Sequence, residues 1–357
     1  MTVSDPTSER FLVTGALGCV GAWTVKTLVD EGALVVTFDQ AGDTKRLRLV
    51  MGPDGPSRVT MLTGDITDAG AVAWALDEYD INRVIHLAAL QLPFAKADPP
   101  LGAMVNVVGT INLFEAVKAR RDRIGPIAYA GSIAMFDATD ADPNDGRLRE
   151  DATPHPMSHY GVFKLANEGN ARIYANDDGV ASVGLRPMVI FGPGRDQGLT
   201  SDPSRAVLSA LLGREFEIGF GGRVLFQFAP DVARAFVTAS RSTGEGARVY
   251  NLDGTLTSVD GFIEVLAREL PGAAGLVRRT GAPLRFPEEI ESASLRELGD
   301  IPVTPLGDAV ATTIAIFRER LDQGQLDPSE HGLGGNRSGR SLGLWSTGRA
   351  ERPMKGP

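Results

Sequence analysis

The chain has 357 residues, enough for one large domain or two modest ones. Its composition, 43% hydrophobic and 23% charged, is that of an ordinary globular protein rather than a disordered or fibrous one. The net charge of −9 argues against a nucleic-acid partner and an anionic membrane surface. The single cysteine, Cys19, cannot form an internal disulfide, no Cys/His cluster has metal-ligand spacing, and no apolar run is long enough to span a membrane. We therefore expect a cytoplasmic protein without a metal site.

The first half of the chain alternates short β-branched runs with longer helical stretches. This order is typical of βαβ units and a parallel sheet, and the uninterrupted apolar runs indicate strands covered on both faces. We predict strands at 11–15, 33–38, 59–65, 83–89, 127–132 and 181–187, and helices at 19–31, 69–79, 101–121 and 158–177.

The alternation of predicted strands and helices stops after residue 187, where a Gly/Pro-rich link begins. The pattern predicts an α/β fold, a Rossmann-type doubly wound parallel sheet with a smaller C-terminal substrate-binding domain. We assign 9–187 to the dinucleotide-binding domain, with 226–257 returning to it, and 188–326 to the second domain. Helices are predicted at 231–240 and 261–270 and a strand at 248–254, and residues 327–357 are expected to be a disordered tail.

A glycine-rich turn joins the first predicted strand to the first helix. Gly15 permits a tight turn, Gly18 lets backbone N–H groups approach a pyrophosphate, and Gly21 lets the helix lie close to the strand. Asp39 follows the second strand, where a carboxylate can accept hydrogen bonds from the adenosine ribose hydroxyls and repel a 2′-phosphate. Asp65 closes the third strand and can accept from the adenine amino group. These residues predict an NAD site.

Tyr160 and Lys164 lie four residues apart and so share one face of a predicted helix. An adjacent ammonium and an oxidised nicotinamide both favour the phenolate, which makes the tyrosine a usable acid/base. Ser132 ends the fifth strand, where open α/β sheets place ligands, and its hydroxyl can hold the substrate oxygen.

The residues above, in this order, resemble the extended short-chain dehydrogenase/reductases, the NAD-dependent epimerase/dehydratase family. The resemblance covers about residues 9–325. It implies that Tyr160 is the acid/base, that Lys164 holds the nicotinamide ribose and that Ser132 orients the substrate. It also implies that further residues line or support the cofactor cleft and that the helices at 101–121 and 158–177 form a homodimer. These cleft residues are Ile66, Leu87, Ala88, Ala89 and Asn106.

Three positions depart from the nucleotide-sugar enzymes of this family. Val189 replaces the asparagine that contacts the diphosphate, and Val224 replaces an arginine that contacts the nucleotide, although Arg223 is only one position away. Residues 280–283 replace an Arg-Pro-Gly-Asp segment. These departures weaken the case for a nucleotide-sugar substrate.

A polar run beginning at Arg195 directly follows the predicted cofactor domain. Arg195 can hold a carboxylate in a charge-assisted fork, and polar neighbours can meet sugar hydroxyls. The same run can instead be a hydrogen-bonded loop that only positions a lid. The substrate candidates are Gln91, His159, Arg195, Gln197, Thr200 and Ser201.

The sequence therefore predicts an NAD-dependent oxidoreductase that acts on a hydroxyl or carbonyl of a sugar, sugar acid or related polyol. A nucleotide-sugar epimerase or dehydratase with tightly bound NAD is the first alternative, because it would use the same Ser132, Tyr160 and Lys164. A non-catalytic NAD-binding regulator is the second alternative, and the intact trio argues against it.

Overall fold

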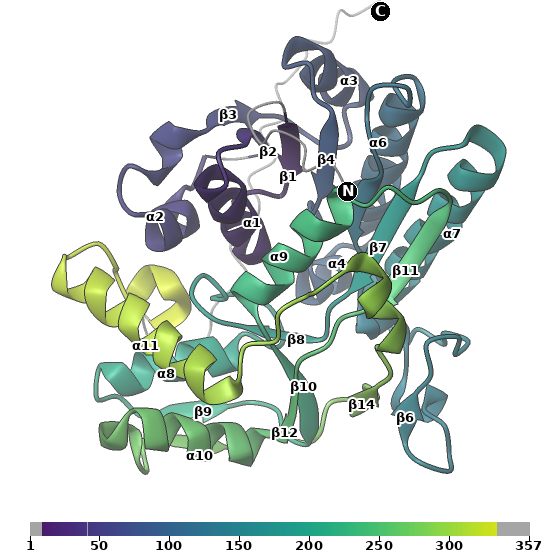
Figure 1. Cartoon of the computed structure of the whole chain (residues 1–357). Coiled ribbons are helices and arrows are strands. Elements are labelled where there is room, and N and C mark those ends of the chain that lie inside the picture. The colour runs from purple at the N-terminus through teal and green to yellow at the C-terminus, as the bar shows by residue number, and fades with distance from the viewer. Residues whose placement is uncertain (1–8, 41, 334–357) are drawn as a thin grey trace, which may run out of the picture.

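The computed structural model describes residues 9–40 and 42–333. Its centre is a seven-stranded parallel sheet in the order β11-β7-β5-β4-β1-β2-β3 (Figure 1). The chain starts in the middle of the sheet, moves to one edge and returns to build the other, which is the doubly wound arrangement predicted from the sequence. The strands are β1 (Arg10–Thr14), β2 (Leu34–Asp39), β3 (Thr60–Thr63), β4 (Arg83–His86), β5 (Ile127–Ala130), β7 (Ser182–Arg186) and β11 (Ala247–Asn251).

Helices cover both faces of this sheet, as its apolar strands require. On β1, Phe11 and Val13 join one apolar cluster, with α1 and α9, while Leu12 joins a second cluster, with α3 and α6. Successive side chains of a strand point to opposite faces, so a continuous apolar run serves two layers at once. The helices of this part are α1 (Cys19–Asp30), α2 (Lys45–Met51), α3 (Ala69–Glu78), α4 (Leu92–Ala97), α5 (Pro99–Ala103), α6 (Gly109–Lys118), α7 (His159–Asp178) and α9 (Ala229–Ser240).

The remaining elements form a smaller layer beside the carboxyl ends of the main strands (Figure 1). A three-stranded sheet has the order β12-β10-β8, and two parallel pairs, β13-β9 and β14-β6, flank it. Residues 226–228 and 255–257 belong to this smaller sheet. Of the stretch 226–257, only β11 pairs with the main sheet and only α9 packs against it. The elements are β6 (Arg147–Leu148), β8 (Val189–Phe191), β9 (Phe216–Ile218), β10 (Arg223–Phe228), β12 (Thr255–Ser258), β13 (Val277–Arg279), β14 (Glu289–Ile290), α8 (Asp202–Leu211), α10 (Val259–Glu269) and α11 (Leu306–Asp322).

The helix predicted over 101–121 is interrupted in the structure. A π-helical segment, Met104–Val108, separates α5 from α6. Inside it, the carbonyl oxygen of Asn106 accepts hydrogen bonds from Thr110 Oγ1 at 2.7 Å and Asn167 Nδ2 at 2.9 Å. These side-chain donors give that carbonyl partners outside the regular helical ladder. The stretch Pro99–Lys118 is long and apolar enough to cross a membrane, but half of its best window is buried inside the fold, as in a core helix.

The first residues of the expected tail are ordered against the body of the protein. Leu326 is buried, and a short π-helix follows at Ser329–Leu333. Its Glu330 carbonyl accepts a hydrogen bond from Lys45 Nζ at 2.9 Å. The expected disorder from residue 327 is therefore not seen up to residue 333, because an apolar anchor and this hydrogen bond hold the segment, and the rest of the expected tail, 334–357, lies outside the described residues.

Candidate active site

The glycine turn after β1 forms a cradle that side chains would fill. Gly15 has φ of +68°, and a Cβ there would lie 2.6 Å from the backbone of Leu87 and Ala88. A Cβ on Gly21 would lie 2.2 Å from the Gly15 carbonyl oxygen, so α1 approaches the turn closely only because this residue is glycine. Gly18 begins α1 as its N-cap, where free N–H groups favour an anion. This cradle fits a dinucleotide pyrophosphate.

Asp39 stands beside this turn, at the carboxyl end of β2. Its Oδ2 accepts a hydrogen bond from the Leu17 backbone N–H at 2.8 Å, and burial raises the pKa of the carboxyl to about 6. Asp65 is engaged differently, since its carboxylate accepts from Thr67 N at 2.9 Å and Gln40 Nε2 at 2.8 Å. Asp39 lines the cavity described below and Asp65 does not. The ribose contact predicted for Asp39 is therefore better placed than the adenine contact predicted for Asp65.

Ser132, Tyr160 and Lys164 converge at the carboxyl end of β5. Burial raises the pKa of Tyr160, while a hydrogen bond from Ser132 and the positive charge of Arg195 act in the opposite direction. Lys164 Nζ lies 5.6 Å from the Tyr160 ring centroid and donates to the Ala130 carbonyl at 2.7 Å. Burial lowers the pKa of Lys164 to about 8. Two elements thus bring a hydroxyl, a phenol and an ammonium group together, as the spacing predicted.

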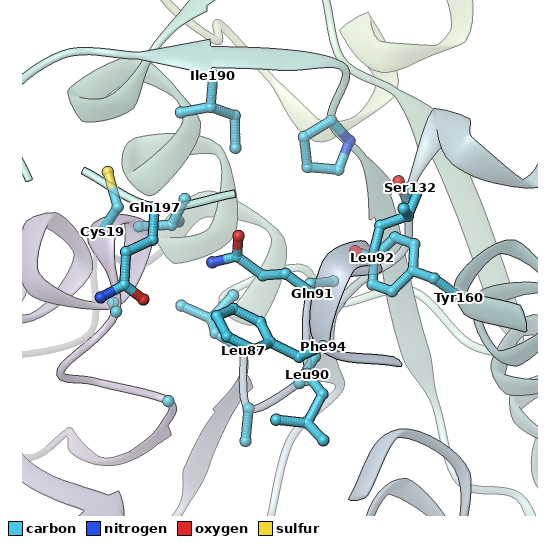
Figure 2. A pocket seen from close by; sticks show the side chains of 18 of the residues that line it. Cys19, Leu87, Leu90, Gln91, Leu92, Phe94, Ser132, Tyr160, Ile190 and Gln197 are labelled. Carbon is cyan, nitrogen blue, oxygen red and sulfur yellow. The ribbon is translucent and has the colours of Figure 1, made fainter. Parts of the chain in front are cut away.

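One cavity of about 440 Å³ connects the glycine turn with these three residues. Figure 2 shows Ser132 and Tyr160 together on one side, Gln197 and Cys19 on the opposite side, and Gln91 between them. Ile66, Leu87, Ala88 and Ala89 also line it, as do Arg195, Gln197 and Thr200. Asn106 lies behind the wall, where its side-chain amide exchanges hydrogen bonds with the backbone of Leu90 at 2.7 and 2.9 Å.

Arg195 is partly buried at the substrate side of this cavity. Its Nη1 lies 3.4 Å from Gln91 Oε1 and its Nη2 lies 3.3 Å from Thr200 Oγ1, both long contacts to neutral groups. Its Nε has no hydrogen-bond partner. Within the described part of the chain, no carboxylate forms an ion pair with Arg195, although its Nε atom is withdrawn from water. A partly buried cation without an ion-pair partner can bind an anion.

Two predicted substrate residues lie elsewhere. His159 is exposed at the start of α7 and stacks on Phe163, with ring centroids 6.1 Å apart, so it faces away from the cavity although its neighbour Tyr160 lines it. Ser201 turns its hydroxyl to the Gly198 carbonyl at 2.9 Å and stabilises the loop instead. Arg223 is exposed at the start of β10, whereas Val224 and the rest of the strand are buried.

Several residues at the cavity could not be predicted from any sequence pattern. Apolar side chains form much of the substrate-side wall, and apolar residues carry no chemical pattern by which to distinguish a wall from a core. Arg46 of α2 also reaches the cavity, and its helix was not predicted. No group of three or more His, Cys, Asp or Glu residues in 9–40 and 42–333 is arranged to hold a metal ion. The apolar wall residues are Leu92, Phe94, Met188, Ile190 and Phe286.

Comparisons with known proteins agree with this geometry. The chain is 30% identical to UDP-glucose 4-epimerase from Mycolicibacterium smegmatis over 326 residues, which are 87% of this chain and 99% of that protein. It is 29% identical to D-erythronate dehydrogenase from Cupriavidus necator over 72% of this chain and 81% of that protein. The solved structure of MoeE5 in complex with UDP-glucuronic acid and NAD is 27% identical, with a TM-score of 0.70 over 87% of this chain and 99% of that one. Residues 11–253 match the NAD dependent epimerase/dehydratase family, and the chain therefore belongs to that family.

Proposed function

We propose that this NAD-dependent enzyme oxidises a hydroxyl group of a small sugar acid whose carboxylate is held by Arg195. The observation that carries the proposal is the partly buried guanidinium itself, with its buried, unpartnered Nε and only neutral, distant contacts at its two Nη atoms. A bidentate carboxylate would replace these weak contacts with charge-assisted hydrogen bonds.

Ser132, Tyr160 and Lys164 would carry the chemistry. Tyr160 Oη would take the proton of the reacting hydroxyl, and Ser132 Oγ would hold the same oxygen as charge develops on it. Lys164 would bind the nicotinamide ribose and keep positive charge near the phenol. NAD, when bound, supplies the hydride acceptor. The glycine turn and Asp39 would hold its pyrophosphate and its adenosine ribose, respectively.

The charge of the cavity wall supports a small acid over a nucleotide diphosphate. Three cationic side chains line the cavity, but Lys164 donates to the Ala130 carbonyl beside Tyr160, and Arg46 is paired with Asp196 at 2.6 Å. Neither Lys164 nor Arg195 has an ion pair among the described residues, but Lys164 already makes a short hydrogen bond, whereas Arg195 has only long contacts to neutral groups, which suits one carboxylate. The positions that would contact a diphosphate or a nucleotide in related enzymes are the buried Val189 and Val224.

A nucleotide-sugar 4-epimerase is the second candidate. The observation that favours it is the alignment with the M. smegmatis UDP-glucose 4-epimerase, which extends over nearly the whole of that protein. Both candidates would use the same three residues at the reacting carbon, so the difference lies in the substrate and in whether a net oxidation occurs.

A substrate panel distinguishes the two. The purified protein would be incubated with NAD and with free sugars, uronates, aldonates including D-erythronate, and UDP-sugars, while NADH absorbance and product identity are followed. We expect NADH to form with one or more of the free acids. NADH formation from neutral sugars alone would contradict the assignment of Arg195, and interconversion of UDP-sugars without net NADH would establish the epimerase.

We further propose that the enzyme works as a cytoplasmic homodimer joined through α6 and α7. Met104 and Val162, which lie near this surface, are 46% and 47% exposed, and Ile173 of α7 is 54% exposed. Large apolar side chains on neighbouring helices favour burial against a second copy. Light scattering coupled to size-exclusion chromatography should give twice the chain mass of 37.9 kDa, and a monomer at micromolar concentration would contradict the proposal.

A further inference from the structure

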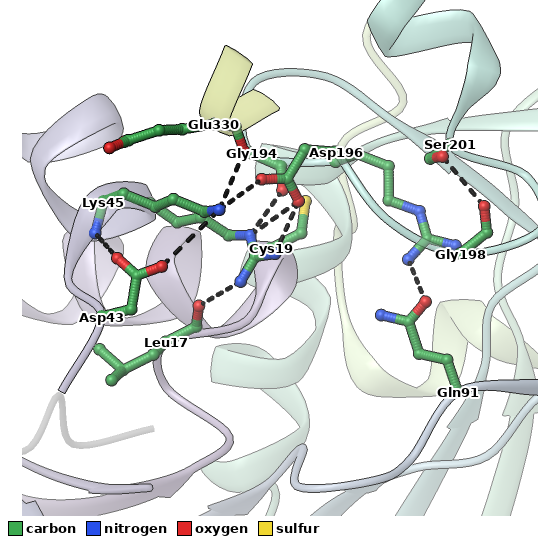
Figure 3. A network of polar contacts seen from close by, with 12 residues as sticks. Leu17, Cys19, Asp43, Lys45, Gln91, Gly194, Asp196, Gly198, Ser201 and Glu330 are labelled. Atoms are coloured by element: carbon green, nitrogen blue, oxygen red, sulfur yellow. Dashed lines mark hydrogen bonds and ion pairs between the residues drawn. The ribbon is translucent and has the colours of Figure 1, made fainter. Parts of the chain in front are cut away.

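Two neighbouring residues of the 192–201 loop are attached to opposite halves of the cleft. Arg195 faces Gln91 at the substrate side. The next residue, Asp196, turns the other way, and its Oδ1 accepts hydrogen bonds from Nε and Nη2 of Arg46 at 3.0 and 2.6 Å. Figure 3 shows Asp196 at the centre of this network, between Lys45 and the part of the loop that meets Gln91.

The attachment of Asp196 is buried and charged. Its side chain is 4% exposed, and Lys45 Nζ lies 3.7 Å from its Oδ2. Breaking a buried ion pair leaves an uncompensated charge away from water, which is far costlier than losing a surface pair. Removing one partner of this contact should therefore disturb the position of the loop.

Arg46 connects the loop to the cofactor cradle as well. Its Nη1 donates to the Leu17 carbonyl at 3.0 Å, within the glycine turn, and its Nε approaches the Gly194 carbonyl at 3.1 Å. Nearby, Trp23 Nε1 of α1 donates to the Pro193 carbonyl at 2.9 Å. The first residues of the loop are thus fastened to the cofactor half, whereas the side chain of Arg195 has only long contacts of its own.

The loop needs such an anchor because its backbone is flexible by composition. Gly194 has φ of +91° and Gly198 has φ of +100°, so glycines in conformations that other residues rarely adopt lie on either side of Arg195. Glycine loses the most conformational freedom on ordering, so a stretch bounded by two glycines keeps one shape only where contacts fix it.

We propose that Asp196 is a positioning residue that holds the Arg195 guanidinium beside Tyr160 by fastening the loop to Arg46. The inference rests on the proposed function, in which Arg195 receives the substrate carboxylate. It adds a link between the substrate arginine and the α2 helix beside the cofactor, through residues 150 positions apart in the sequence.

The first test is Asp196→Asn, which keeps the shape of the side chain and removes its charge. We expect KM for the best acid of the panel to rise about tenfold, because Arg195 no longer has one fixed position. The kcat should stay within about threefold of the wild-type value and the Kd of NAD within about twofold, because the contacts that position Tyr160 and the glycine turn do not include Asp196. Equal loss of acid and NAD binding would overturn the proposal.

The second test is a double-mutant cycle with Arg195→Lys. If Asp196 acts through Arg195, the double variant should be no more than about twofold worse than Arg195→Lys alone, whereas independent sites give multiplicative effects on kcat/KM. Multiplicative effects would overturn the positioning role and leave the proposed function intact. An Arg195→Lys enzyme with unchanged kinetics would instead refute the proposed function, and the positioning role with it.

Two further variants separate positioning from general loosening of the fold. Asp202→Asn is the matched control, since Asp202 pairs with Arg205 at 3.0 Å in the same layer without reaching the cofactor half. Its KM should stay near the wild-type value, and a rise equal to that of Asp196→Asn would overturn the proposal.

Arg46→Lys tests the contact from its other side if Asp196→Asn does not fold. This variant keeps the positive charge but loses the two guanidinium N–H groups that bind Asp196. We therefore expect KM for the acid to rise severalfold, and an unchanged KM would contradict the proposed role of the Arg46–Asp196 contact.

Discussion

The carboxylate of Asp39 accepts a hydrogen bond from the backbone N–H of Leu17 at 2.8 Å, which joins the end of β2 to the glycine turn after β1. The parts of the site predicted to bind the ribose and the pyrophosphate are therefore one connected unit. Lys45 and Arg46 lie near this unit, but both are engaged by carboxylates, Asp43 and Asp196 among them. The unpaired charge at the predicted ribose position is thus the negative charge of Asp39.

We expect NAD to bind at least tenfold more tightly than NADP, a difference of about 1.4 kcal/mol. The Asp39 carboxylate would repel a 2′-phosphate, and the nearby cations are already paired. Titration of both cofactors by calorimetry checks this. Asp39→Asn should reduce the preference, and equal affinities in the wild-type protein would show that Asp39 does not face the ribose.

Cofactor affinity should also depend on pH through the same carboxyl group. Burial raises the pKa of Asp39 to about 6, so the group is mostly ionised at pH 7 and mostly protonated at pH 5. The ionised form accepts hydrogen bonds from the ribose hydroxyls more strongly than the neutral acid does, so the Kd of NAD should rise by up to about tenfold from pH 7 to pH 5. Asp39→Asn should flatten this profile, and an unchanged slope in that variant would assign the pH dependence to another group.

A pair of glycine substitutions tests the cradle itself. A Cβ on Gly21 would meet the Gly15 carbonyl at 2.2 Å, so Gly21→Ala must displace backbone and should cost about 2 kcal/mol of folding stability as well as NAD affinity. Gly169 lies within α7 with open space around it, so Gly169→Ala should instead stabilise the protein by up to about 1 kcal/mol. Denaturant unfolding and NAD titration of both variants provide the comparison, and similar behaviour would contradict the close approach at Gly21.

Sequence patterns predicted those parts of the site whose residues lie close together in the chain. The strand, glycine turn and helix at 11–31 form as expected because each step depends on neighbouring residues, and Tyr160 and Lys164 meet because they are one helical turn apart. Placement of single side chains was less predictable. His159 and Tyr160 are adjacent, yet only one faces the cavity, since a helix turns by about 100° per residue. The contact of Arg46 with Asp196 joins distant segments, and no spacing rule could identify it.

Removing the Tyr160 hydroxyl should separate chemistry from cofactor binding. In Tyr160→Phe we expect kcat to fall about a hundredfold or more, because no other group at the reacting oxygen can take its proton, while the Kd of NAD stays within about twofold. Steady-state rates and NAD titration provide the two readouts. A nearly normal rate would remove the basis of the proposed chemistry.

Lys164→Met should affect both properties. The ammonium group is buried and donates to the Ala130 carbonyl at 2.7 Å beside the phenol, so its loss removes positive charge from the site and a predicted ribose contact together. We expect kcat to fall at least tenfold and the Kd of NAD to rise at least tenfold. A loss of turnover with unchanged NAD binding would show that Lys164 acts in the chemical step and does not bind the ribose.

The last prediction concerns the charge of the substrate. A guanidinium pairs a planar carboxylate through two parallel N–H groups, and a lysine cannot reproduce that fork. Arg195→Lys should therefore raise KM for a sugar acid by about tenfold or more, while NAD affinity and any activity on neutral sugars change little. Arg223→Lys is the matched control, because Arg223 is exposed at the start of β10 and does not line the cavity, so its kinetics should match the wild type. If acids and neutral sugars respond alike to Arg195→Lys, the guanidinium shapes the loop rather than binding the carboxylate, and the nucleotide-sugar alternative becomes the better account of this site.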